Sequence, residues 1–368
     1  ELTDIINGGA LPGRATGADY GRASQGAAWA LLARMYLNAE VYTGTERYAD
    51  CMNACQEVFN QGYALATQYQ ALFSGDNTTN PDATQEIIFP VILDADATQT
   101  WANLIAASRP VEVSEEIQNA EGDTKQRFCL SEWGMREGWA GYRATGELVQ
   151  MFEYADNNNP KADEIVDKRG IFRDQNYDGE PLTLRIGSTV TGTFHTNGWW
   201  VYKWTNLNHD GEPMYSEDDA TTVIWPDTDI PLIRLGDVYL MYAEAAARTG
   251  QNLSTAVGYI NELRGRGYEH QGNYTVNENW LTASAQVGYD GPSVPFGNIL
   301  NERCRELYWE GQRRTDLIRF GLLTGGTYLW EWKNGAENGS SVNDRYNLYP
   351  IPVSDMQANG GLTQNAGY

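Results

Sequence analysis

A tryptophan-rich stretch, LSEWGMREGWAGYRAT from Leu130, combines residue types that bind sugars. Aromatic faces cover the apolar C–H side of a pyranose ring, while arginine groups donate hydrogen bonds to its hydroxyls. Trp139 lies among glycines shortly before a helix expected around Leu148, where loop backbone can leave an indole exposed. The predicted glycan-binding residues are Trp101, Trp133, Arg136, Trp139, Tyr142 and Arg143.

A second aromatic stretch, TNGWWVYKWTN at 196–206, has the pattern of a strand. Because side chains alternate along a strand, bulky residues point to both of its faces between 199 and 204. A strand with two bulky faces is typical of one that is covered on both sides. We therefore interpret this stretch as mainly structural.

Oxygen-rich side chains occur at two positions where calcium could bind. Asp174, Asn176 and Asp178 follow the D-x-N-x-D-G order that opens an EF-hand loop, but the twelfth position is Arg185 instead of glutamate. An ordinary Asx-rich turn is the favoured alternative. The second position, Asp94 and Asp96, directly follows a strand-like run. Any calcium would be structural, and no cofactor is required.

Catalytic motifs are missing from the sequence. The three histidines, His195, His209 and His270, lie in no HExxH motif, and there is no GxSxG, P-loop or GxGxxG. Carboxylates are abundant, and a glycoside hydrolase needs only two at the right separation. We predict no enzymatic activity, with an unrecognised carboxylate pair as the alternative.

The amino-acid composition limits the classes of molecule that the protein could bind. Hydrophobic residues make up 41% of the 368 positions, and the formal net charge is -23. Such a charge disfavours nucleic acid, whose binding depends on Lys and Arg neutralising phosphates, and suits neutral sugars or cations. No apolar run is long enough to cross a bilayer. Cys51, Cys55, Cys129 and Cys304 show no zinc-like spacing, and the first two are expected to be small buried side chains.

Helical periodicity predicts pairs of antiparallel helices and a mainly α-helical fold. Gly236, Tyr239 and the alanines that follow resemble a tetratricopeptide repeat signature, although the two pairs lie too far apart for a continuous solenoid. The first hairpin covers 21–62, with a C-cap at Gly62. A second pair has a first helix that stops near Gly250, and one long helix runs from Phe296, with Glu310 and Arg314 paired on its exposed face. The residues expected on the apolar faces are Ala28, Leu32, Met35 and Ala39; Tyr48, Cys51, Cys55 and Val58; Leu232, Leu235, Tyr239, Tyr242 and Ala246; Leu253, Val257 and Ile260; and Leu300, Cys304, Leu307 and Ile318.

The segment 80–229 is rich in Gly, Asn, Asp, Thr and Trp, with strands expected only in short runs such as EIIFPVIL and LTLRIGSTVTGTF. Loops on a rigid helical frame commonly carry binding residues. We therefore predict one domain over 1–368: the 21–62 hairpin, an 80–229 binding region and a 230–368 helical region.

Four segments resemble the C-terminal half of the SusD/RagB family, in that family's order. They are RLGDVYLMYAEAAARTG, YINELRGRG, ILNERCRELYWEGQRRTDLIRFG and YNLYPIPVSDMQANGGLTQNAGY. GRASQGAAWALLARMYLNAEVYTG resembles the family's helix-hairpin segment. NAEVYTGTERY and EGWAGYRAT are similar to the starch-binding branch.

The resemblance implies a surface glycan-binding lipoprotein of the Bacteroidetes outer membrane. Such proteins lid a TonB-dependent, SusC-like transporter and pass oligosaccharides into it, and their membrane contact is a lipid anchor that this chain does not include. Their fold is an α/α superhelix of tetratricopeptide-like pairs framing a loop-rich binding face. By the same resemblance, Trp139 matches a position where starch-binding members stack a sugar.

Family members carry a lipidated cysteine and a helical segment before the first hairpin, where this sequence has only about twenty residues. We therefore expect an N-terminal part, and some glycan-binding residues with it, to be missing. Besides starch, the alternatives are another glycan, peptides, a glycoside hydrolase, or a pure assembly protein whose aromatics grip a transporter.

Overall fold

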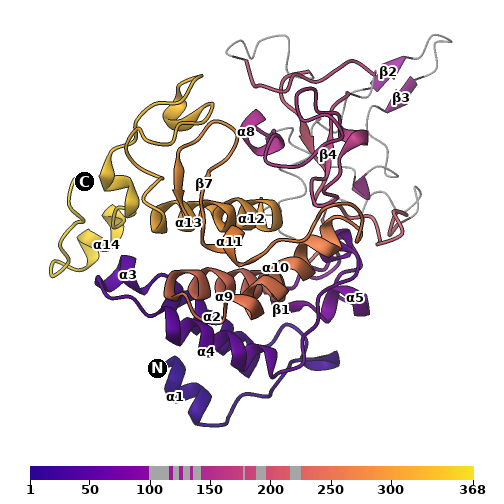
Figure 1. Cartoon of the computed structure of the whole chain (residues 1–368). Coiled ribbons are helices and arrows are strands. Elements are labelled where there is room, and N and C mark those ends of the chain that lie inside the picture. Colours follow the sequence, from indigo (N-terminus) through magenta and orange to yellow (C-terminus); the bar gives the residue numbers. More distant parts are fainter. Residues whose placement is uncertain are drawn as a thin grey trace.

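Paired helices form the scaffold of the protein, seen here in a computed structural model (Figure 1). The structure describes residues 1–98, 133–135, 142–176, 179–187, 196–215 and 225–368, and the backbone of 116–118 and 124–126. The described residues between 133 and 215, coloured magenta, lie on one side of the helices. Among helices of the described residues, none combines the length and apolar content needed to cross a bilayer.

The predicted N-terminal hairpin is present. It consists of α2 (Gln25–Leu37), α3 (Ala39–Thr43) and α4 (Tyr48–Phe59), preceded by α1 (Leu2–Asn7). The Ser24 hydroxyl accepts a hydrogen bond from the Ala27 N–H and caps α2. The predicted apolar face of α4, including Cys51 and Cys55, is buried. The prediction for Met35 was wrong, since this side chain is 48% exposed and the alanines of α2 form the packed face.

The second pair, α9 (Leu235–Thr249) and α10 (Leu253–Gly267), builds the main core. Helix α9 contacts α4, α10 and α12, and nearly every residue in it is buried. It ends at Gly250 as predicted, with a left-handed φ of 67° that glycine adopts without strain. Leu232 lies outside this helix, in strand β6 (Ile230–Arg234), because Pro231 and the antiparallel pairing with β1 (Ile87–Val91) keep the chain extended.

The long helix expected from Phe296 is two helices, α12 (Gly297–Leu307) and α13 (Arg313–Arg319). The chain turns between them, where Trp309 has φ 59° and Gly311 has φ 77°. The predicted exposed pair was also wrong: Glu310 binds the buried Arg234, while Arg314 contacts the Tyr346 carbonyl. Leu300, Cys304 and Leu307 are buried as predicted, whereas Ile318 is only partly buried.

The described strands are short and form two-stranded ribbons. Besides β1 and β6, β2 pairs with β3, β4 with β5, and β7 with β8. The EIIFPVIL run is a strand as predicted, but residues 182–187 of the LTLRIGSTVTGTF run are not, and 188–194 lie outside the described residues. The remaining elements are α5 (Pro81–Thr84), β2 (Glu116–Gln118), β3 (Thr124–Gln126), α8 (Gly146–Val149), β4 (Phe172–Arg173), β5 (Trp200–Val201), α11 (Glu278–Thr282), β7 (Ser284–Gln286), β8 (Ser293–Pro295), α14 (Val353–Ala358), and 3-10 turns at Gly17–Asp19, Tyr69–Phe73, Ala162–Glu164, Lys333–Gly335 and Asp344–Asn347.

The WWVYKW stretch is structural, as interpreted from its pattern. Trp200 and Val201 form β5, and Trp204 packs edge-on against Phe73. Residues 199–204 are buried apart from Tyr202, which is partly buried. Trp199 and Trp200 fill a second core between the loop-rich segment and α12, whereas Trp204 belongs to a third core with Tyr69 and Phe73.

Candidate functional site

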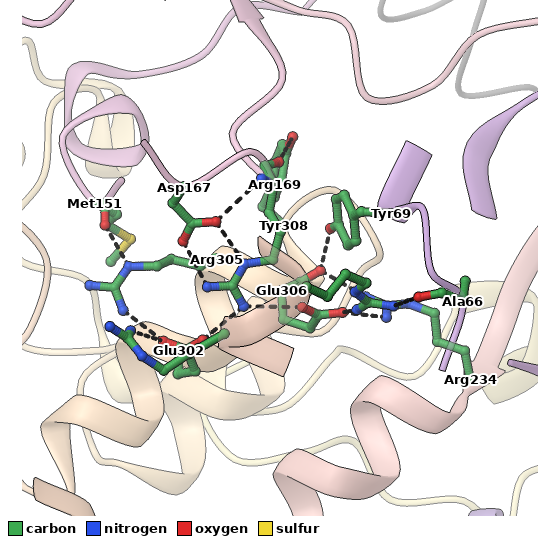
Figure 2. Close-up of polar contacts among 12 residues, drawn as sticks. Ala66, Tyr69, Met151, Asp167, Arg169, Arg234, Glu302, Arg305, Glu306 and Tyr308 are labelled. Carbon is green, nitrogen blue, oxygen red and sulfur yellow. Dashed lines mark hydrogen bonds and ion pairs between the residues drawn. The ribbon is translucent and has the colours of Figure 1, made fainter. Parts of the chain in front are cut away.

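A buried ionic network joins the loop-rich segment to helix α12 (Figure 2). Glu302 and Glu306, one turn apart on α12, are both fully buried. The Arg169 Nη1 atom lies 2.7 Å from Glu302 and 3.1 Å from Glu306, and Arg169 is also paired with Asp167. Unpaired charges of this kind are costly to bury, so each one must keep its partners.

The same network reaches the helix pairs and the first ribbon. The Arg234 Nη1 atom lies 2.6 Å from Glu306 and 2.9 Å from Glu86, and Arg266 contacts the same two carboxylates. The Arg305 Nε atom donates to the Met151 carbonyl at 2.7 Å, which fixes the turn after α8. Buried pairs add little net stability, and we infer that their role here is to set loop position.

Electrostatics keep these carboxylates ionised. Burial by itself would raise the pKa of Glu302, but the surrounding guanidinium groups, Arg169 first, lower it to about 2. Burial lowers the pKa of Lys203 to about 8, although its amino group contacts Glu310 at 2.6 Å. The network is therefore charged at neutral pH.

An aromatic pair, one ring exposed and the other partly buried, lies beside this frame. Tyr142, which is 54% exposed, meets the ring of Trp309 edge to face, with centroids 6.0 Å apart. Trp309 lies in the turn between α12 and α13, where a positive φ is unusual for a tryptophan. Such strain is tolerated only where the surroundings enforce it, and it often marks a functional position.

Next to the pair is an apolar pocket of about 220 Å³. Trp309 contributes to its wall and also meets the Tyr142 ring, which is not itself part of the lining. An aromatic edge beside an apolar hollow can take the C–H face of a sugar ring. The lining residues are Thr145, Glu147, Leu148, Met151, Cys304, Tyr308, Trp309, Arg313, Leu317, Tyr328 and Trp330.

Arg143 follows Tyr142 but faces the protein. Its guanidinium lies 5.9 Å from the Trp200 ring centroid, and its Nη1 atom donates to the Tyr142 carbonyl at 3.0 Å. Burial lowers its pKa to about 10, so it stays charged at neutral pH. Arg143 therefore supports the backbone that presents Tyr142, and its role as a ligand donor stays a prediction.

The prediction that Trp133 binds a glycan was wrong. Its side chain is completely buried and packs on Tyr202, with ring centroids 4.1 Å apart. The next residue, Gly134, has φ 69°, and a Cβ there would lie 2.2 Å from the Asn206 carbonyl oxygen. This close approach holds Trp133 in the core, so in this structure no sugar can reach its ring.

The other predicted glycan-binding residues, Trp101, Arg136 and Trp139, lie outside the described residues. The structure thus brings the exposed Tyr142 against Trp309 and places Arg143 behind it. Sequence reasoning missed Trp309 because it predicted one continuous helix here, although Gly311, two residues later, is a local signal of a break.

The two expected calcium positions contain turns. The Asn176 Oδ1 atom accepts the Glu180 N–H at 2.9 Å, and the Asp174 carboxylate accepts the Ala162 N–H. The Asp94 Oδ1 atom accepts two N–H groups, from Asp96 and Ala97. Among the described residues no three His, Cys, Asp or Glu side chains gather as metal ligands, and Asp178 lies outside them. Calcium binding stays a prediction.

Comparison with known proteins decides the family. Residues 187–368 match the SusD family. The starch-binding protein SusD of Bacteroides thetaiotaomicron is 34% identical over 382 residues, which cover 95% of this chain and 61% of the relative. The chain belongs to the SusD family. A SusD-like protein, P25 of Formosa agariphila, is 25% identical and matched over 60% of its length, so this SusD-family chain spans about three fifths of both relatives.

Solved structures agree on the fold of this SusD-family chain. A SusD superfamily protein from Parabacteroides distasonis has a TM-score of 0.65 and 21% identity, over 100% of this chain and 67% of that one. The surface glycan-binding protein A of Bacteroides thetaiotaomicron has a TM-score of 0.62 and 17% identity, over 99% and 68%. The predicted mainly helical, SusD-like scaffold is therefore confirmed.

The structure explains one motif of the SusD-family resemblance. In NERCRELYWEG the glutamates recur every fourth residue, at Glu302, Glu306 and Glu310. Glu302 and Glu306 lie on one face of α12, Glu310 follows in the turn after the helix, and each is paired with Arg169 or Arg234. The motif thus anchors the loops, and its Trp309 meets the Tyr142 ring.

Proposed function

We propose that this SusD-family protein captures oligosaccharides, with starch and maltooligosaccharides as its ligands, without catalysing a reaction on them. The observation that carries the proposal is the 34% identity, across 95% of the chain, to a starch-binding protein. The chain covers only 61% of that relative, so the whole relative's function is applied here as a proposal.

The exposed Tyr142 ring, held against the partly buried Trp309, supports the proposal. A helical maltooligosaccharide presents the C–H faces of successive glucose rings, and aromatic rings bind such faces. The Tyr142 ring is exposed, and the Arg143 guanidinium donates a hydrogen bond to the Tyr142 carbonyl. Because this bond holds the backbone in place, little reorganisation is needed before a sugar stacks on the ring. Trp139, three residues earlier, is our proposed principal stacking residue on the ground of the family resemblance.

We further propose that the protein works at the outer membrane as a surface lipoprotein and delivers its ligand to a TonB-dependent, SusC-like transporter. This part rests on what the SusD family resemblance implies. Co-purification of the transporter with the tagged protein from solubilised outer membranes tests it.

Calorimetric titration with maltoheptaose is the direct test of the binding proposal. We expect micromolar-to-millimolar affinity for the wild type. Trp139→Ala should abolish measurable binding, and Tyr142→Ala should weaken it by roughly 3- to 10-fold, the effect of losing one stacking contact of about 1 kcal/mol. Tyr349→Ala, which removes another exposed tyrosine, is the matched control and should bind as the wild type does.

Other outcomes point to other functions. New reducing ends appearing during incubation would indicate a glycoside hydrolase. Binding to a different glycan or to peptides, with no heat from maltoheptaose, would remove the starch assignment. No binding to any ligand, together with a stable transporter complex, would indicate an assembly protein.

A further inference from the structure

A second hollow lies on the other side of the turn that follows α8. It is a pocket of about 370 Å³ between residues 150–160 and helices α10, α11 and α12. Met151 lines both this pocket and the apolar pocket beside Trp309, so the two pockets are neighbours that share this side chain. The volume is at the lower end of the range of about 300–1,000 Å³ for ligand pockets, which suits one or two sugar rings.

Aromatic rings and arginine side chains form its walls together. Trp280 and Tyr268 both lie against Arg264, whose guanidinium carbon is 5.8 Å and 5.0 Å from their ring centroids. Tyr289, at the rim, is 44% exposed. Rings held by cation–π contacts are pre-organised and can cover a sugar face without first losing conformational freedom.

Several polar groups of the pocket have hydrogen-bonding capacity left. Arg264 and Arg305 use their Nε and Nη1 atoms on backbone carbonyls and on Glu302 (Figure 2 shows Arg305), and within the described residues their Nη2 atoms donate to nothing. The Asn157 Oδ1 atom accepts the Tyr154 N–H, which leaves its amide nitrogen available. The Gln150 side chain has no partner among the described residues.

Charge in and behind the pocket is balanced. Arg264 and Arg305 share the Glu302 Oε2 atom, at 3.2 Å and 3.0 Å. Glu153, at the rim, is the second carboxylate of the lining region, so two cations face two anions. The third cation near Glu302, Arg169, is itself paired with Asp167. A ligand with a net charge would therefore find no unpaired charge of opposite sign, whereas hydroxyl groups can use the remaining donors and acceptors.

We infer that this pocket is a second saccharide site, which takes a neutral hexopyranose unit between Trp280, Tyr289 and the Nη2 atoms of Arg264 and Arg305. This inference goes beyond the proposed capture of oligosaccharides at Tyr142 and Trp139. The residues of the pocket are different, and the pocket does not require starch as the ligand. Its affinity for one sugar unit is expected in the millimolar range, about 4 kcal/mol.

Saturation-transfer NMR titration with methyl α-D-glucopyranoside and methyl β-D-galactopyranoside tests the site. The titration is made on a Trp139→Ala/Tyr142→Ala background, which removes the proposed capture site. We expect at least one of the two glycosides to bind with a Kd below about 20 mM. Adding Gln150→Ala and Tyr289→Ala should weaken that binding by at least roughly fivefold, since both side chains line the pocket and neither makes a side-chain hydrogen bond within the described structure.

Tyr349→Ala, added to the same background, is the control and should leave binding unchanged. No binding of either glycoside up to about 100 mM, or equal binding with and without the two pocket substitutions, would overturn the site. If D-glucuronate bound tenfold more tightly than both glycosides, the assignment of the pocket to neutral sugars would be overturned. A maltoheptaose titration of the wild type runs alongside, so failure of the capture proposal is seen separately.

Discussion

Arg169 and Glu302 form a completely buried ion pair, with 2.7 Å between the Arg169 Nη1 and Glu302 Oε1 atoms. One partner comes from the loop-rich segment and the other from helix α12. The position of the loops therefore depends on a helix that lies more than a hundred residues further along the chain. This dependence leads to predictions for stability that are separate from those for binding.

Glu302→Gln should lower the free energy of unfolding by about 3–5 kcal/mol, because it leaves Arg169 and its neighbours as buried cations without their carboxylate. Urea unfolding followed by tryptophan fluorescence measures the change. Glu46→Gln, which makes the same substitution at an exposed position, is the control and should change it by less than about 0.5 kcal/mol. A Glu302→Gln effect as small as the control's would contradict a structural role for the network.

Acid should destabilise the protein steeply between about pH 5 and pH 2. Burial would raise the pKa values of Glu302, Asp237 and Glu244, but arginine charges lower each to about 2. A folded-state pKa below the unfolded value of about 4 gives stability that is full above pH 5 and is lost as pH falls through the folded pKa. Urea midpoints measured from pH 7 to pH 2 test this, and a flat profile would refute it.

Asp229 changes the free energy of unfolding with pH in the opposite direction. Burial raises its pKa to about 6, even though its Oδ1 atom accepts the Leu93 N–H at 2.9 Å. The folded protein therefore holds this proton more tightly than the unfolded chain, and the free energy of unfolding declines as pH rises from about 4 to 6. Asp229→Asn should remove that decline and stabilise the protein at pH 7, by thermal unfolding. An unchanged difference between pH 4 and pH 7 would count against it.

Trp133→Ala should behave as a core mutation. The loss of a completely buried indole should cost about 3–5 kcal/mol in the free energy of unfolding. Tyr142→Ala, nine residues away but exposed, should cost less than about 1 kcal/mol. Denaturant unfolding of both variants compares them. Similar small costs would return Trp133 to the set of candidate binding residues.

Calcium removal should leave the fold intact. At Asn176 and Asp94 the side-chain oxygens already accept backbone N–H groups, which compete with a metal for the same lone pairs. We expect EDTA to change Tm by less than about 1 °C. A fall of several degrees that added calcium reverses would place a structural calcium ion in the protein.

Local patterns in the sequence were reliable where one helix face decided the structure. The buried face of α4 and the end of α9 at Gly250 follow from periodicity and from the left-handed conformation that glycine adopts. The two-sided burial of residues 199–204 follows equally from strand alternation. These features depend on neighbours a few residues apart.

Other predictions failed because long-range contacts decided them. Glu310 and Arg314 have the spacing of a helical pair, but Arg234, far away in sequence, takes Glu310 and the chain turns at Trp309. Trp133 looked like a loop tryptophan, but the Asn206 backbone closes over the adjacent Gly134. Neither contact leaves a periodic signal near the residue concerned.

The sequence by itself determined the helix pairs, the family and the structural role of WWVYKW, because side-chain periodicity and motif order are local properties. Only the tertiary structure decided that the glutamates of α12 anchor the loops, that Tyr142 meets Trp309, and that Arg264 and Arg305 share Glu302 beside a pocket. Apart from Arg305 and Glu302, which are neighbours on α12, those pairings join residues from 38 to 167 positions apart, and burial makes each charge depend on partners that only folding brings together.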